Sequence, residues 1–312
     1  MSRWATLALL VSCTAWAQAA AQGRGFVRTR VPDRPICLHW EKRVYNYNFH
    51  FAGSQQTPAD AEFLAMEAAF QTWRELARGC SDFRFEQGQD VGVAEIGFNP
   101  DSADNTNVLV YREQACRDVV PANDDCYLRD DCANVYQCWD HSDGTIALTT
   151  TTFSFKTGII YDADVEFNAA PNQVGQRLLF TTVSSPQCDP GAESALCAAT
   201  DVQNTLTHEI GHVIGLDHVD VLGSTMEPSA PPGEVSKRVL DTGTQAGFCF
   251  IYPSGDLTPP CEELAEGERR IVAVNRGTPG LNHMGCVAGT GAPALLAALL
   301  AVRALRRRRC SR

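Results

Sequence analysis

The sequence HEIGHVIGLDH at residues 208–218 carries the strongest fold signal in this chain of 312 residues. His208 and His212 are four residues apart, so on a helix both imidazoles lie on one face, one turn from each other. That spacing suits two ligands of a single tetrahedral zinc ion. Glu209 lies beside them, in position to take a proton from a water that the metal activates.

The residues around this stretch predict a helix that ends shortly before a third ligand. Thr200 and Gln203 have the spacing of a capping box, which would start the helix, and Gly215 can adopt the left-handed conformation that ends one. The chain can then turn back and bring His218 to the same metal. Three protein ligands leave the fourth position to water, which is the catalytic arrangement. The apolar face of the helix is expected to contain Val202, Leu206, Ile210, Val213 and Ile214.

The pattern H-E-x-x-H-x-x-G-x-x-H resembles the signature of metzincin metalloproteases. That family also has a methionine in a tight turn beneath the zinc, and Met226, in the sequence STMEP at residues 224–228, follows His218 by eight residues. This spacing is similar to that of the matrixin branch. The resemblance implies an α+β, zincin-like metzincin fold, in which a twisted mixed β-sheet carries an active-site helix and a Met-turn.

Further segments resemble matrixins over residues 37–255. Residues 68–73 are similar to the first helix of that branch, residues 147–152 to the edge strand that pairs with bound peptide, and residues 240–252 to the last helix. The resemblance therefore implies a zinc endopeptidase with protein or peptide substrates, with Glu209 as its general base.

The sequence departs from the matrixin pattern in two places. No Pro-Arg-Cys-Gly switch precedes the domain. Asp162, Asp164 and Glu166 occupy the region where matrixins hold a structural zinc and calcium, but Asp164 replaces a histidine, so a second zinc is not expected. These three carboxylates are candidate ligands of Ca²⁺, and the alternative is that they are solvated strand residues.

Hydrophobic periodicity predicts the remaining elements. We expect strands at residues 44–51, 82–85, 91–98, 146–153 and 159–167, a helix at residues 59–78 and a short helix near residues 235–247. Residues 100–144 read as an acidic, cysteine-rich insertion. The domain plan is a signal peptide at 1–21, a short segment at 22–36, the catalytic domain at 37–255, a linker at 256–285 and a tail at 286–312.

Both ends of the chain read as targeting segments. Residues 1–21 have the basic, apolar and small-residue regions of a secretory signal peptide, although a lipidated Cys13 is an alternative. In the tail, a cysteine motif at Cys286, an apolar run and an arginine cluster resemble the MYXO-CTERM sorting tail of myxobacterial surface proteins. That resemblance implies anchoring or processing at Cys286 and a membrane contact before processing; a plain membrane anchor is the alternative.

Cysteine usage agrees with export. Of the 13 cysteines, ten lie in the body of the chain: Cys37, Cys80, Cys116, Cys126, Cys132, Cys138, Cys188, Cys197, Cys249 and Cys261. An even number in an exported domain predicts disulfides. The sequence does not determine their connectivity, but the short loop between Cys188 and Cys197 favours that pair.

Charge and composition narrow the function. The net charge of -11 argues against nucleic acid as a partner.

From the histidine motif, the matrixin resemblance and the two ends of the chain, we expect an exported, monomeric zinc endopeptidase, extracellular or on the outer surface of a Gram-negative bacterium. A surface-anchored binding or adhesion protein with a vestigial zinc site is the alternative, and a processing enzyme for one partner protein would share the same chemistry.

Overall fold

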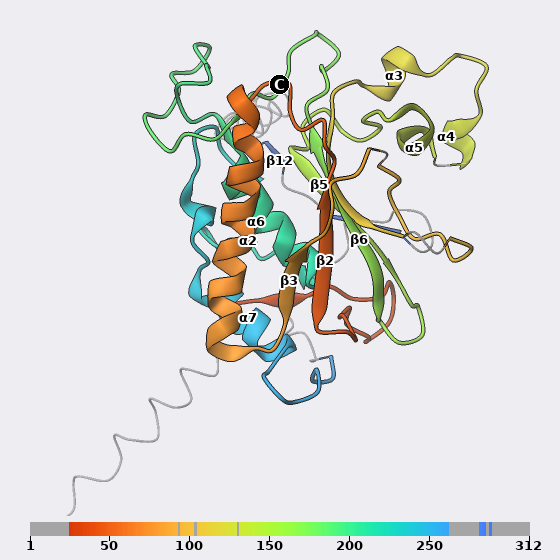
Figure 1. Ribbon diagram of the computed structural model, residues 1–312, viewed down its shortest axis with the longest axis vertical. Coiled ribbons are helices and arrows are strands. Elements are labelled where there is room, and N and C mark those ends of the chain that lie inside the picture. The colour runs from red at the N-terminus through yellow and green to blue at the C-terminus, as the bar shows by residue number, and fades with distance from the viewer. Residues whose placement is uncertain are drawn as a thin grey trace, which may run out of the picture.

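A computed structural model describes residues 25–92, 94–102, 105–129, 131–261, 281–284 and 287–288. Its centre is a mixed β-sheet with two long helices packed on one face (Figure 1). The sheet strands from residues 44–168 are β2 (Val44–Phe49), β3 (Arg84–Gln87), β4 (Asn107–Arg112), β5 (Ala147–Phe153) and β6 (Ile160–Asn168). The α+β class and the mixed sheet are confirmed.

The order of the sheet is β11-β5-β6-β4-β2-β3. Strands β3, β2, β4 and β6 are parallel to one another, whereas β5 is antiparallel to β6. The sixth strand, β11 (Leu281–Met284), comes from far along the chain and pairs antiparallel with β5. The five strands of the body thus leave β5 at one edge, and the C-terminal segment covers that edge.

Strand β4 is buried on both faces of the sheet. Leu109 and Tyr111 belong to the main core, and Val108 and Val110 belong to a second cluster with Ala94. Successive side chains of a strand point to opposite faces of the sheet, so β4 has apolar side chains on both faces, as buried parallel strands do. Because this strand lies within residues 100–144, the predicted insertion at that range is corrected: its first part is a central strand of the sheet.

The main core lies between the sheet and helices α2 (Ala61–Cys80), α6 (Val202–Val213) and α7 (Thr242–Ile251). The apolar face predicted for residues 59–78 is confirmed, because Met66, Phe70 and Trp73 of α2 are buried. The Phe70 ring stacks on Tyr47 of β2 with ring centroids 3.6 Å apart. The Trp73 indole donates a hydrogen bond to the Thr207 carbonyl oxygen at 3.1 Å, which ties α2 to α6.

Short elements complete the fold. They are β1 (Val27–Arg28), η1 (Pro58–Asp60), α3 (Cys116–Val119), α4 (Cys126–Arg129), α5 (Cys132–Tyr136), β7 (Phe180–Thr181), β8 (Thr200–Asp201), β9 (Leu216–Asp217), β10 (Ser229–Ala230), η2 (Ser236–Arg238) and β12 (Val287–Ala288). Strand β1 pairs with β9, β7 with β8 and β10 with β12. The helix expected near 235–247 is thus resolved into η2 and α7.

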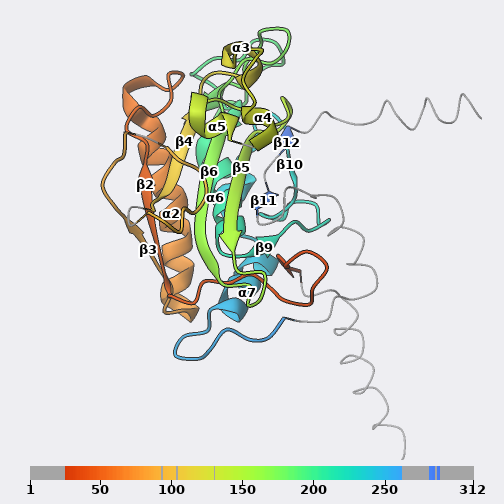
Figure 2. The same cartoon turned by 90° about the vertical axis from the view of Figure 1, so that its right-hand side faces the viewer.

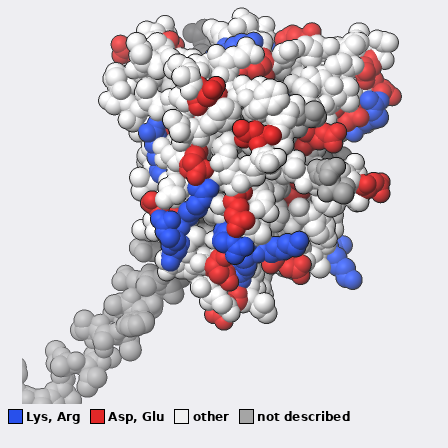
Figure 3. All heavy atoms as spheres, in the orientation of Figure 1, with Lys and Arg blue, Asp and Glu red and all other residues white. Residues whose placement is uncertain are grey.

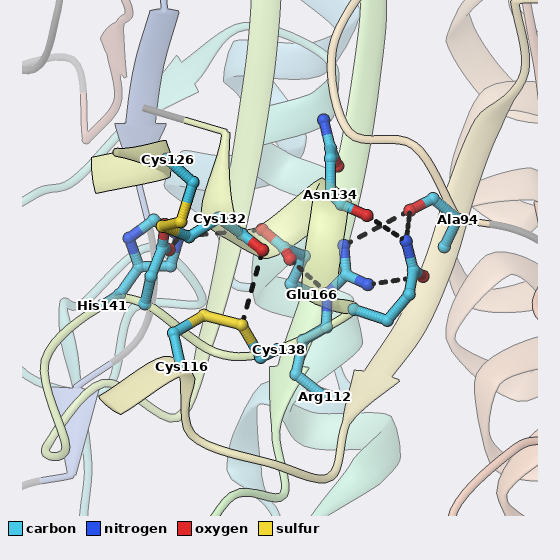
Figure 4. Close-up of a disulfide and its surroundings, with 11 residues drawn as sticks. Ala94, Arg112, Cys116, Cys126, Cys132, Asn134, Cys138, His141 and Glu166 are labelled. Carbon is cyan, nitrogen blue, oxygen red and sulfur yellow. Dashed lines mark hydrogen bonds and ion pairs between the residues drawn. A yellow bond between two sulfur atoms is a disulfide. The ribbon is translucent and has the colours of Figure 1, made fainter. Parts of the chain in front are cut away.

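The helices α3, α4 and α5 cover the sheet face opposite α2 and α6. The Asn134 side chain of α5 binds both the backbone N–H and the carbonyl oxygen of Ile96, at 2.8 Å and 3.0 Å. Figure 4 shows this region, with the Arg112 side chain directed at Glu166 beside the two disulfides of the insertion. The strand expected at 91–98 is wrong: apart from a bridge between Val91 and His50, the described residues there form a loop held by the insertion.

The described cysteines form five disulfides, which join Cys37–Cys261, Cys80–Cys249, Cys116–Cys138, Cys126–Cys132 and Cys188–Cys197. The pair predicted from its short loop, Cys188–Cys197, is confirmed. The Cys37–Cys261 bond fastens the start of the predicted linker to the body, and Arg28 donates hydrogen bonds to the carbonyl oxygens of Pro259 and Pro260.

The described part of the segment predicted at 22–36, residues 25–36, belongs to the body, because Phe26, Val27 and Val31 are buried in the main core. Acidic and basic side chains are interspersed over the face drawn in Figure 3, so the negative net charge does not gather in one patch there. Among the described residues, no helix has the length and apolar character needed to cross a membrane.

Candidate metal centre and active site

The N-cap of helix α6 lies one residue later than the sequence suggested. Its N-cap is Asp201, whose carboxylate accepts a hydrogen bond from the Asn204 N–H at 2.7 Å. The Thr200 and Gln203 capping box is therefore wrong. Arg238 also donates from its Nε to the Asp201 carboxylate at 2.8 Å. This ion pair holds the residues after β10 against the start of the helix.

The end of α6 follows the prediction for Gly215. This residue has a φ of +91°, and a Cβ there would lie 2.7 Å from the Leu38 carbonyl oxygen, so both conformation and space favour glycine. The Trp40 indole donates a hydrogen bond to the Val213 carbonyl oxygen at 2.8 Å. The Tyr252 hydroxyl donates one to the Ile214 carbonyl oxygen at 2.9 Å. The chain then reverses through β9 to His218.

Three imidazoles converge at this reversal. The Nε2 atom of His208 lies 3.1 Å from Nε2 of His212 and 3.2 Å from Nε2 of His218, and the last two atoms are 3.1 Å apart. Zinc–nitrogen bonds of about 2.0–2.1 Å in a tetrahedron place ligand nitrogens about 3.3 Å apart. Among the described residues, these histidines are the one group of three or more metal-binding side chains that meets closely enough to share an ion.

The other nitrogen of two of these rings fixes the tautomer. His208 donates from Nδ1 to the Thr225 carbonyl oxygen at 2.6 Å, and His212 donates from Nδ1 to that of Leu216 at 2.9 Å. In a neutral ring, the Nε2 atom then carries a lone pair and no proton. Lone pairs this close repel each other unless a cation lies between them, so the donor set fits a metal ion.

Burial keeps the histidines neutral. It lowers the pKa of His208 and of His212 well below the usual 6.5, and it lowers that of His218 to about 4. The neighbouring imidazoles also disfavour a positive charge on His208 and His212. Neutral imidazole is the form that binds metals, so these side chains need not lose a proton at neutral pH to do so.

Glu209 is fully buried beside the triad and is held by the edge strand of the sheet. The Thr149 hydroxyl donates to Oε2 of Glu209 at 2.6 Å. The same hydroxyl lies 3.3 Å from the backbone carbonyl oxygen of Glu209. Strand β5 therefore fixes the Glu209 carboxylate and the backbone beside it.

Met226 lies in a turn directly under helix α6. It is 1% exposed, and a Cβ on Gly211 would lie 2.2 Å from its sulfur atom, so the helix leaves room for this side chain only because residue 211 is glycine. The turn is held by Asp241, the N-cap of α7, whose Oδ2 accepts from the Thr225 N–H at 2.8 Å and from the Ser224 hydroxyl at 3.0 Å. Because the Thr225 carbonyl binds His208, Asp241 supports the triad indirectly.

We expect Asp241→Ala to destabilise the domain by about 3 kcal/mol, since it removes both a helix N-cap and the hydrogen bonds to the turn. The melting temperature at pH 7 should fall by about 6–12 °C. Scanning calorimetry of the variant beside Asp189→Ala, a change in an exposed loop, measures this. Equal melting temperatures for both variants would contradict the role of Asp241.

The same variant gives an expectation for pH. Burial opposes ionisation of Asp241, but hydrogen bonds from Thr244, Thr225 and Ser224 outweigh it and hold its pKa below the usual 3.8. The stabilisation is therefore present above pH 3.8 and is lost as the pH falls through the lowered pKa. The difference in melting temperature between wild type and Asp241→Ala should therefore become smaller as the pH falls through that acidic range.

The three candidate calcium ligands do not form one cluster. Glu166 Oε1 accepts from Arg112 Nε at 2.6 Å, with both side chains buried. Asp164 instead accepts from the backbone N–H groups of Gly97 and Val108, at 2.7 Å and 2.8 Å. Burial raises the pKa of Asp162 to about 6, and it raises that of Asp164 further because the two carboxyl groups adjoin.

These carboxylates lie on the sheet face away from α6, since their neighbours Ala163, Val165 and Phe167 face the main core. They are buried and not solvated, which corrects the alternative reading of this segment. Calcium binding stays a prediction. Cys286, the signal peptide and most of the sorting tail lie outside the described residues, so the predictions for them stay untested too.

Residues 127–252 match the family model described as Matrixin. This segment is matrixin-like. It runs from α4 to the residue after α7, so the matrixin-like segment contains the three histidines, Glu209 and Met226. The family indicates a metallopeptidase with a catalytic zinc. No curated protein matches the chain.

Two contributors to the site were missed from the sequence. Thr149 was assigned only to an edge strand, because nothing in a single sequence indicates which of four consecutive threonines contacts Glu209. Asp241 could have been found: Asp-Thr-Gly-Thr at residues 241–244 has a typical N-cap residue before a helix. Its second role, holding the turn before Met226, depends on a contact across 16 residues.

Proposed function

We propose that this protein is a zinc-dependent endopeptidase whose metal is held by His208, His212 and His218. The observation that carries the proposal is the convergence of three Nε2 atoms within 3.2 Å, with two of the rings fixed by Nδ1 donation to carbonyl oxygens. Such a set leaves one tetrahedral position open, which is the arrangement of catalytic zinc sites. The match to the Matrixin family supports the same activity.

The roles of the side chains follow from their positions. When bound, zinc supplies a Lewis acid that polarises the scissile carbonyl and acidifies a water. Glu209 accepts the proton of that water and returns it to the leaving amine. Thr149 holds the Glu209 carboxylate in one orientation through its 2.6 Å hydrogen bond. Met226 supports the helix from below, where Gly211 leaves space for its sulfur.

The proposed substrates are extended segments of proteins or peptides. Among the five strands of the body, β5 is an edge strand of the sheet. Its Thr149 side chain contacts Glu209 of α6. An extended peptide that adds to this strand would pass the proposed base with its backbone hydrogen bonded to the sheet. Strand addition selects chain conformation more than side chains, which favours cleavage within flexible segments.

We further propose that the protein is exported, as a monomer, to the outside of a Gram-negative cell. Five disulfides support an oxidising compartment. The signal-peptide pattern of residues 1–21 and the tail at 286–312 support export and surface attachment. The alternative, an adhesion protein with a vestigial zinc site, finds no support in the geometry, because the proposed base and all three ligands are present.

Zymography on casein and gelatin, with and without a chelator, tests the proposed function. We expect about one zinc per chain by elemental analysis and clearing of the gel that the chelator abolishes and added zinc restores. A peptide-library cleavage profile then gives the specificity. A chain that binds zinc but cleaves no substrate, even after removal of its C-terminal segment, would favour the binding protein.

A milder change tests the support of the proposed base. Thr149→Val removes the hydroxyl that contacts Glu209 while keeping the shape and β-propensity of the side chain. A hydrogen bond to a charged group contributes about 1.5–3 kcal/mol, so we expect kcat to fall at least about 10-fold with little change in KM. The matched control is Thr151→Val on the same strand, whose buried hydroxyl has no hydrogen-bond partner among the described residues.

A further inference from the structure

Two short strands from the C-terminal part of the chain pair with segments that lead to the proposed active site. Leu281–Met284 pairs antiparallel with β5, and Val287–Ala288 pairs parallel with β10. We call these two strands, residues 281–284 and 287–288, the C-terminal strap. In Figure 2, β10, β11 and β12 lie beside the β5 edge of the sheet.

The register of the first pairing brings the strap to the proposed base. Leu281 is opposite Thr152, and Met284 is opposite Thr149, the residue whose hydroxyl binds Glu209. The strap therefore uses the edge of β5 along the same four residues that an added peptide strand would need. While β11 is paired there, that edge cannot accept another strand, since each ladder position bonds one neighbour on that side.

The second pairing involves the segment that follows Met226. Val287 is opposite Ser229, which follows Met226 by three residues, and the Thr225 carbonyl binds His208. The strap therefore pairs both with the strand that contacts Glu209 and with the segment next to the turn that contacts His208.

We propose that the C-terminal strap occupies the peptide-binding groove of this protein and inhibits its own peptidase activity until the strap leaves. This inference rests on the proposed function, because the proposed function assigns the β5 edge to substrate. The occupant is a segment of the same chain. Its covalent connection to Cys261, which is disulfide-bonded to Cys37, makes the pairing intramolecular. Tethered segments reach effective concentrations on the order of millimolar, so even weak strand pairing competes with dilute substrate.

The test uses the full chain with Asn282→Pro and His283→Pro together. Successive strand residues direct their N–H groups to opposite sides, so the pair removes one donor to β5 whichever residue faces it. The matched control is Ala273→Pro with Val274→Pro, which adds two prolines before the strap. We measure amide hydrogen exchange of residues 149–152, and kcat/KM on a fluorogenic peptide with zinc bound.

We expect the strap variant to lose exchange protection in β5 and to gain at least about 10-fold in kcat/KM, mainly through KM, because a blocked groove lowers apparent affinity by the fraction of open molecules. The control variant should match wild type in the exchange protection of β5 and in kcat/KM. Unchanged protection, or lost protection in an active enzyme without a gain in kcat/KM, overturns the inhibition. If β5 loses protection and neither protein cleaves any substrate, strap occupancy stands and the proposed function fails.

Discussion

Glu209→Gln should lower kcat/KM for peptide hydrolysis by about 10³-fold while leaving the zinc content unchanged. The amide keeps the shape of the side chain and a hydrogen-bond acceptor for Thr149, but it cannot take a proton from water. General-base catalysis contributes about 10²–10⁴-fold. Because Glu209 is fully buried, a shape-conserving change also protects the packing of α6.

Rates and zinc content need to be measured on the same preparations, in chains with and without the strap prolines so that groove occupancy does not hide activity. Glu193→Gln, a change in an exposed loop, is the matched control. Wild-type rates in a zinc-loaded Glu209→Gln protein would exclude Glu209 as the base. Loss of zinc together with activity would instead indicate that the variant perturbs the metal centre.

Arg112→Met should destabilise the protein by about 3–5 kcal/mol, because it leaves the Glu166 carboxylate buried without its cation. The two side chains are 1% and 2% exposed, and burial opposes ionisation of Glu166 while Arg112 and His141 lower its pKa to about 2. Arg112 also donates to the Gln137 side chain at 2.9 Å, so it fastens the insertion to the sheet (Figure 4).

A double-mutant cycle checks this interpretation. Arg112→Met with Glu166→Leu should recover most of the lost stability, since replacing both partners by apolar groups removes the uncompensated charge. Arg78→Met is the control, because that arginine is exposed and lies 3.9 Å from Glu75. Urea unfolding of wild type, Arg112→Met, Glu166→Leu and the double variant gives the coupling energy. A loss below about 1 kcal/mol in Arg112→Met would mean that solvent or another cation compensates Glu166.

The histidine triad was predictable because its geometry is mostly local. Two ligands are one helical turn apart, and Gly215 supplies the left-handed residue that lets His218 return within three more residues. The same holds for the disulfide across the short loop at 188–197. Such features depend on spacing along the chain, which a single sequence states directly.

The errors arose where distant contacts determine the structure. Residues 91–98 alternate like a strand but bind α5 of the insertion, and β4 was hidden in an acidic, cysteine-rich stretch although both its faces are apolar. The pairing of Leu281–Met284 with β5 was not predicted, because the composition of that segment gives no sign that β5 would accept it. Tertiary partners override local pattern in each case.

The Cys37–Cys261 disulfide has a consequence for how proteolysis of this chain is detected. It closes a ring of chain from residue 37 to residue 261, so a single cut anywhere within that ring leaves the two fragments covalently joined. Nicked molecules would run at full length on a gel without reducing agent and separate only after reduction. Ageing preparations could therefore accumulate hidden cuts and keep their fold, and purity is best judged under both conditions.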